Sequence, residues 1–176
     1  MILITTSGRP AQRMRTLCND LQRVIPKAMR INRGKLSIKG LAEKALEVGA
    51  DRIIMVERRK GGPGCIKLCT LPIHSGETFT YFLSGVKTQD DIGRRTTIRE
   101  GLIVTVEKNA STLVRRVANH FARFLIVPLL EETVSQDFKA SAHFSCFREN
   151  EIKLSFTIPS IIKEIGPTLF LRCPNW

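Results

Sequence analysis

The sequence predicts an α/β protein built from two tandem copies of one α/β unit. Ile2–Thr5 and Leu102–Val106 are short apolar runs with the length and composition of buried strands. After a polar turn, each run is followed by a segment whose apolar residues recur every three or four positions, which is typical of an amphipathic helix. Shifting the chain by 100 residues superimposes both pairs of segments without a gap. The shared register indicates an internal duplication.

The composition fits a folded protein with a polyanionic partner. The 176 residues are 43% hydrophobic and carry a formal charge of +12. Residues 1–60 contain fourteen Lys and Arg against five Asp and Glu, whereas residues 61–176 contain fourteen against eleven. A basic region of this kind favours nucleic acid, although a solvated basic face kept for solubility would look similar. Without an apolar run of about 18 residues or a signal-peptide pattern, we expect a soluble, cytoplasmic protein with no membrane partner.

In the first half, the strand at 2–5 leads into a turn at 6–10 and then a helix. Met14, Leu17 and Leu21 share one face of this helix, and Pro26 ends it. Ser37 is placed to cap a second helix that runs to about Val48. Further strands are expected at 52–57, 65–71 and 78–86, with a turn at 58–64 between the first two.

The polar segment 87–99 is predicted to connect the two halves, which are expected at 1–90 and 100–176. A strand at 102–106 and a helix capped by Ser111 or Thr112 open the second half. A hairpin of strands at 140–147 and 152–158 and a closing strand at 168–173 complete it. The duplication pairs Met14 with Val114 and Arg15 with Arg115. Two independent strand–helix units under the same burial demand would be the alternative.

The turn after the first strand has the composition of an anion site. It combines hydroxyl side chains, free backbone N–H groups and a guanidinium at the positive end of a helix. It is not a Walker loop, because the Lys-Ser/Thr ending is missing. Alternatively, Thr6 and Ser7 only cap the helix. With the neighbouring basic residues, the predicted RNA-binding set is Thr5, Thr6, Ser7, Arg9, Arg13, Arg15, Arg30 and Arg33.

The cysteines offer little for metal or thiol chemistry. Five scattered cysteines argue against a disulfide framework, and Cys65, Cys69 and His74 lack the spacing of a zinc site. We therefore expect no metal and no cofactor.

Two further groups of residues have side chains that could carry chemistry. The adjacent pairs at 90–91 and 131–132 are read as solvated carboxylates rather than an acid/base pair, because neighbours on a chain point apart. Phe79, Tyr81 and Phe82 either pack in the core or form a base-stacking platform.

Several short motifs, in order and spacing, resemble the Brix-domain proteins of ribosome biogenesis nearly end to end. They are Thr5-Thr6-Ser7-Gly8-Arg9-Pro10 with Arg13, Arg15 and Leu17, then Arg33-Gly34, the helix at 41–49, Gly62-Pro63, Leu71-Pro72 and Ile165-Gly166-Pro167. The chain is similar to the compact archaeal type and to the branch that in eukaryotes joins small-subunit pre-rRNA processing. The resemblance implies one Brix domain over 1–176, with each half similar to the anticodon-binding domain of class II aminoacyl-tRNA synthetases.

The residues and the resemblance together predict a non-enzymatic factor that binds rRNA or pre-rRNA alongside other ribosome assembly proteins. A protein-interaction scaffold, whose basic face contacts acidic assembly partners, is the first alternative. An RNA-modifying enzyme is the second, and it would require a cysteine thiolate of depressed pKa in a cleft. The oligomeric state is left open by the sequence.

Overall fold

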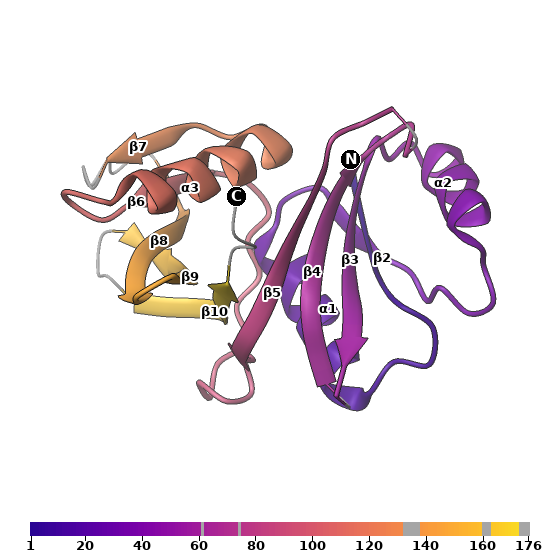
Figure 1. Cartoon of the computed structure of the whole chain (residues 1–176), viewed down its shortest axis with the longest axis horizontal. Helices are drawn as coiled ribbons and strands as arrows, with labels where there is room; N and C mark the ends of the chain where they lie inside the picture. Colours follow the sequence, from indigo (N-terminus) through magenta and orange to yellow (C-terminus); the bar gives the residue numbers. More distant parts are fainter. Residues whose placement is uncertain (61, 74, 132–137, 160–162, 173–176) are drawn as a thin grey trace.

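One continuous sheet of ten strands runs through the part of the chain that the structure describes. The computed structural model describes residues 1–176 except 61, 74, 132–137, 160–162 and 173–176. The strand order is β2-β1-β3-β4-β5-β10-β9-β8-β6-β7. Figure 1 shows the sheet bent into two lobes, one from the indigo-to-magenta part of the chain and one from the orange-to-yellow part. The fold is therefore mixed α/β, as the sequence predicts.

The first lobe contains five strands and two helices. In chain order they are β1 (Ile2–Thr6), α1 (Gln12–Val24), β2 (Ala28–Arg30), α2 (Ile38–Glu47), β3 (Arg52–Arg59), β4 (Gly62–Thr70) and β5 (Thr78–Lys87). The second lobe contains β6 (Leu102–Val106), α3 (Thr112–Leu125), β7 (Leu129–Glu131), β8 (Ala140–Arg148), β9 (Glu151–Ile158) and β10 (Lys163–Arg172).

The two lobes have the same strand order and the same strand directions. β1 lies parallel to β2 and β3, and β6 lies parallel to β7 and β8. In each lobe two antiparallel strands follow, and the last strands of the lobes, β5 and β10, pair with each other. The bounds of β1 and β6 differ by 100 residues, as do the starts of α1 and α3, which is the shift found in the sequence.

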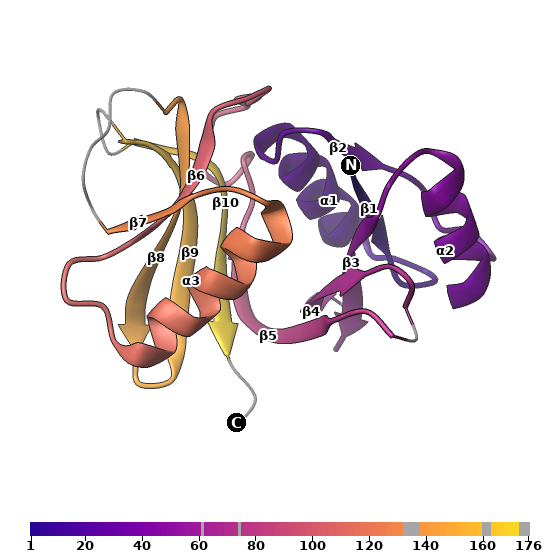
Figure 2. The same cartoon turned by 90° about the horizontal axis from the view of Figure 1, so that it is seen from above.

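Helices cover both faces of the first half of the sheet. Alternation along β1 turns Ile2 and Ile4 toward α1 and Leu3 toward α2, so both faces of this strand are buried. Figure 2 shows α1 and α2 on opposite sides of β1 and β3. α1 and α3 belong to one large core, whereas Leu41 and Ala45 of α2 belong to a smaller one. We call the sheet surface on the α2 side the outer face.

The two lobes share their core, because each long helix contacts the other lobe. α1 packs on β10, where a Cβ added at Gly166 would lie 2.6 Å from Phe156 Cβ and 2.8 Å from Val24 Cγ1. Arg52 on β3 donates from Nη1 to the carbonyl of Phe124 near the end of α3, at 2.6 Å. A buried cation at a helix C-terminus suits both the unpaired carbonyls and the helix dipole.

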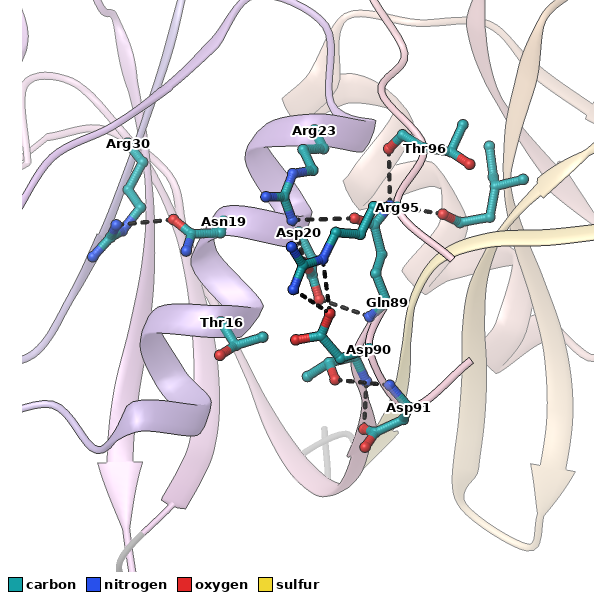
Figure 3. A network of polar contacts seen from close by, with 12 residues as sticks. Thr16, Asn19, Asp20, Arg23, Arg30, Gln89, Asp90, Asp91, Arg95 and Thr96 are labelled. Carbon is teal, nitrogen blue, oxygen red and sulfur yellow. Dashed lines mark hydrogen bonds and ion pairs between the residues drawn. The ribbon is translucent and has the colours of Figure 1, made fainter. Parts of the chain in front are cut away.

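The connector between β5 and β6 is fixed to both lobes. Gln89 is fully buried; its backbone N–H donates to Asp20 Oδ2 at 2.8 Å, and its Nε2 donates to the carbonyls of Thr96 and Ile165. Figure 3 shows this network between α1 and the connector. Asp20 is buried, and this burial raises the pKa of its carboxyl against the opposing hydrogen bond from Gln89 and the charge of Arg23. The predicted polar connector is thus anchored in the interior at Thr88 and Gln89, whereas most of its other residues are exposed.

Some strand limits differ from the sequence prediction. β2 and β7 were not predicted, and β10 begins at Lys163 rather than at residue 168. The pairing of β10 with β9 shifts register between Glu164 and Thr168. Gly166 lies in this irregular stretch and makes the tight contact with α1, and the following proline remains within the strand. β4 begins at Gly62, inside the predicted turn, and Gly64 has no room for a Cβ beside Arg59.

Candidate RNA-binding site

Four of the predicted arginines line one cavity, which we call the arginine pocket. It lies where β1 ends and α1 begins, beside β2, and has a volume of about 370 Å³. The described residues that line it include no Asp or Glu. They are Thr6, Ser7, Gly8, Arg9, Pro10, Arg15, Arg30, Asn32, Arg33 and Gly34. Parallel pairing of β2 with β1 brings Arg30 next to a loop that is distant in the sequence.

The guanidinium of Arg30 is held by neutral partners. Its Nη1 donates to Asn19 Oδ1 and its Nη2 to Asn32 Oδ1, each at 2.8 Å, and Figure 3 shows the contact with Asn19. Among the described residues, the buried Nε of Arg30 has no hydrogen-bond partner. The amides orient the group without neutralising it, so its positive charge stays available to a ligand. Asn19 and Asn32 were not in the predicted set, since amides carry no charge signal in a sequence.

The first turn of α1, which contributes Arg15 to the pocket, has no capping side chain. The N-cap is Ala11, which provides no side-chain hydrogen bond, and the first turn contains no acidic residue. The alternative that Thr6 or Ser7 caps this helix is therefore wrong. Ser7 Oγ instead accepts a hydrogen bond from the backbone N–H of Arg58 on β3 at 3.1 Å. Uncapped N–H groups at a helix start favour anions.

Arg9 adopts a backbone conformation that is unusual for a residue with a side chain. Its φ is 50°, in the left-handed region, and its side chain is exposed at the pocket. Strain of this kind is common at ligand sites, where the surrounding loop holds the residue in place.

Two members of the predicted set lie elsewhere. Thr5 is fully buried, and its hydroxyl donates to the carbonyl of Ile31 at 3.1 Å. Arg13 donates from Nη2 to Asp91 Oδ2 at 2.7 Å and to the carbonyl of Val86 at 2.8 Å, so it anchors the connector. Residues two apart on a helix point to opposite sides, which separates Arg13 from Arg15. The spacing of two residues between Arg13 and Arg15 can be read from the sequence, and on a helix it predicts that the two side chains lie on different sides.

A cavity of about 450 Å³ occupies the equivalent place in the second lobe. It lies between the end of β6, the start of α3 and β7, and Arg115 there matches Arg15 by the 100-residue shift. Arg115, however, donates to Glu131 through Nη1 and to the carbonyl of Ala110 through Nε. The second lobe thus holds a counterpart of the arginine pocket in which Arg115, the equivalent of Arg15, is paired with a carboxylate.

The three buried thiols do not have the environment of a nucleophile. Burial raises the pKa of Cys18 to about 12 and that of Cys65 to about 11, and burial also raises the pKa of Cys69. A nucleophilic cysteine needs the opposite shift. Residues His74 and Cys173 lie outside the described residues. Within the described part of the chain, no group of three or more His, Cys, Asp or Glu residues could hold a metal ion, and no helix could span a membrane.

The three aromatic residues of β5 are divided between the two faces of the sheet. Phe79 stacks on His120 of α3 with ring centroids 4.2 Å apart, and the Tyr81 hydroxyl lies 2.8 Å from His120 Nδ1. Both rings face the shared core, whereas Phe82 turns outward and is 36% exposed. Core packing therefore accounts for two of these residues only.

Comparison with known sequences finds archaeal relatives. A probable Brix domain-containing ribosomal biogenesis protein of Methanopyrus kandleri is 29% identical over 96% of this chain and 92% of its own length. A protein of the same description from Pyrococcus horikoshii is 37% identical over 61% of this chain, and the match spans 50% of that relative. The U3 small nucleolar ribonucleoprotein protein imp4 of Schizosaccharomyces pombe is 23% identical over 97% of this chain and 59% of its own length. No family model matches the sequence.

Comparison with solved structures gives the same result for the fold. The crystal structure of a probable ribosomal biogenesis protein from Aeropyrum pernix superposes with a TM-score of 0.84 and 26% identity, covering 99% of this chain and 97% of that one. An archaeal Imp4-like protein superposes with a TM-score of 0.65 and 18% identity over 98% of this chain and 97% of its own, which shows a shared fold. By sequence and by fold together, the chain is similar to archaeal Brix domain-containing ribosomal biogenesis proteins.

Proposed function

We propose that this protein is a cytoplasmic, non-enzymatic ribosome biogenesis factor that binds rRNA or pre-rRNA through the arginine pocket. The observation that carries the proposal is the group Arg9, Arg15, Arg30 and Arg33 around one cavity without a lining carboxylate. Guanidinium groups and free helix N–H groups recognise phosphate oxygens, and such contacts position an RNA strand without reading its sequence.

The names of the relatives support the biological setting. The archaeal relatives are described as ribosomal biogenesis proteins, and the fission yeast relative belongs to a small nucleolar ribonucleoprotein. We extend this to pre-rRNA processing for the small subunit, with other assembly proteins as partners. We also propose that the two lobes are duplicated units of the kind found in the anticodon-binding domains of class II aminoacyl-tRNA synthetases, a proposal that their matching strand order supports.

The two lobes offer a matched experiment. Binding of pre-rRNA fragments, with a transfer RNA of similar length as comparison, is measured as a function of salt concentration for wild type, Arg15→Gln and Arg115→Gln. Each lost phosphate contact should lower the salt slope by about 0.7 to 0.9. We expect this decrease in salt slope for Arg15→Gln, alone or combined with Arg9→Gln. We expect an unchanged slope for Arg115→Gln, because Arg115 already bonds Glu131. Equal affinity and slope for the folded Arg9→Gln, Arg15→Gln double variant would overturn the proposal.

A second candidate is a protein-interaction scaffold with incidental RNA contact. An apolar cavity of about 380 Å³ beside α2 favours it, because Leu46 there is 63% exposed and Ile38 is 39% exposed. Exposed aliphatic side chains around a hollow are typical of protein contacts. Tight binding of an assembly protein that Leu46→Asp abolishes, together with a salt slope near zero for RNA, would favour this function over the first.

A further inference from the structure

We propose that the outer face of the sheet, on both sides of the β5–β10 pairing, stacks unpaired bases of the bound RNA. We call this surface the seam face and define it by Arg59, Phe82, Phe147, Arg148, Phe170 and Arg172. The inference rests on the proposed RNA-binding function and names the part of the RNA that the protein would hold besides phosphate, namely single-stranded bases.

The first observation is that two large aromatic rings face solvent on this surface. Phe82 is 36% exposed and Phe147 is 43% exposed. On β5 the alternation of side chains turns Tyr81 into the core and leaves Phe82 outside. Exposure of a phenylalanine ring to water is unfavourable. Two exposed rings on one sheet face, beside a third at Phe170, therefore indicate a binding surface.

The second observation is that an arginine covers each exposed ring. The guanidinium carbon of Arg59 lies 5.4 Å from the centroid of the Phe82 ring, and that of Arg148 lies 5.0 Å from the Phe147 ring. The rings of Phe147 and Phe170 are 4.5 Å apart. Planar guanidinium groups and aromatic rings are the two kinds of side chain on which nucleic-acid bases stack.

The third observation is that the two lobes contribute equivalent positions. Phe82 pairs with Cys65 of β4, and Phe170 pairs with Lys153 of β9. Each residue of the second pair lies 88 positions after the corresponding residue of the first pair. Phe170 therefore occupies the place of Phe82 in the second lobe. Gly85 lies beneath the Phe170 ring, and an added Cβ would come within 3.2 Å of it. The two aromatic positions therefore flank the seam on one surface.

The seam face is also linked to the arginine pocket. Arg58 donates its backbone N–H to Ser7 in the pocket loop, and the next residue, Arg59, covers Phe82. One RNA strand could then place a phosphate in the pocket and its following bases on the rings.

The arginines of the seam face would attract any polyanion, and the rings beneath them favour RNA over an acidic peptide. Two nearby carboxylates are engaged, since Glu151 accepts from Arg172 at 2.6 Å and Glu164 from Lys153 at 2.5 Å. Within the described residues, Arg59 and Arg148 form no ion pair with a carboxylate. An acidic peptide would use these two charges but not the flat rings beneath them, whereas a nucleotide uses both.

The test uses single-stranded oligonucleotides that carry 2-aminopurine, whose fluorescence falls when it stacks, and a duplex of equal length. Phe82→Leu and Phe147→Leu keep an apolar side chain but remove the ring. Ile126→Ala at the end of α3, an exposed site away from the seam, is the control. We expect each ring variant to weaken single-strand binding about tenfold and to reduce quenching. The salt slope should stay as in wild type because no charge is removed.

Two further results separate the possible failures. Arg59→Lys keeps the charge but loses the plane, and it should weaken single-strand binding and leave duplex binding unchanged. If the folded Phe82→Leu, Phe147→Leu double variant binds and quenches like wild type while Arg9→Gln, Arg15→Gln loses affinity, the stacking surface is refuted and the proposed function stands. If wild type binds no RNA at all, both are refuted.

Discussion

Replacing Gln89 with leucine removes the side chain that ties the connector to both lobes. Gln89 Nε2 donates to the carbonyl of Thr96 at 2.8 Å, which is partly exposed, and to the buried carbonyl of Ile165 at 2.7 Å. Water can replace the first hydrogen bond, so its loss costs about 1 kcal/mol. The Ile165 carbonyl would remain buried without this donor, at a cost of about 1–3 kcal/mol. Gln89→Leu should therefore lower the free energy of unfolding by roughly 2–4 kcal/mol.

Urea denaturation measures this change directly. The midpoint should fall with an unchanged m-value, and the melting temperature should drop by about 4–16 °C. Gln22→Leu, at an exposed position of α1, is the matched control and should stay within about 0.5 kcal/mol of wild type. RNA affinity of the folded Gln89→Leu protein should not change, because Gln89 does not line the arginine pocket. A loss of stability below about 1 kcal/mol would show that the connector is not held by these bonds.

Three other substitutions test separate features of the fold. Gly166→Ala places a Cβ 2.6 Å from Phe156 Cβ and should cost about 1–3 kcal/mol in urea denaturation, whereas Gly62→Ala, with open space around it, serves as the control and should not. Burial, aided by the charge of Arg123, holds the pKa of His120 below its ordinary 6.5, so neutral His120 favours the fold. Stability should be full above about pH 6.5 and fall as the pH drops toward the lowered pKa; His120→Gln should remove this dependence, and an unchanged pH profile would contradict the assignment. Arg9→Gly relieves a φ of 50°, so denaturation should show a gain of up to about 1 kcal/mol while RNA affinity falls, and a clear loss of stability would argue against strain at this position.

The regular elements of the first strand and helix of each lobe could be predicted because burial and periodicity agree there. β1 and β6 are mostly apolar and buried throughout, and α1 and α3 each keep one apolar face. β2 and β7 could not be predicted, since each has three residues and exists only because it pairs with the strand beside it. β10 was shortened in the prediction because a glycine and a proline normally mark its start as a turn.

The candidate site could be predicted in part for similar reasons. The loop after β1 has a local signature, and the charge of Arg30 and Arg33 was visible in the basic region. Their convergence with the loop depends on β2, which has no signal of its own. Phe82 was a stacking candidate in the sequence, but its contact with Arg59 and the presence of Phe147 and Phe170 on the same surface depend on the folded sheet.

The packing of α1 on β10 also sets an order of events during synthesis. β10 is the last of the described strands to leave the ribosome, and until it does, the face of α1 near Val24 and the edge of β5 have no native partner. Contacts between distant parts of a chain form slowly and leave apolar surface exposed meanwhile. The N-terminal lobe therefore cannot complete its native structure before β10 has been synthesised, and a truncated product lacking β10 should be open to proteolysis and aggregation rather than persist as a half-sized binding module.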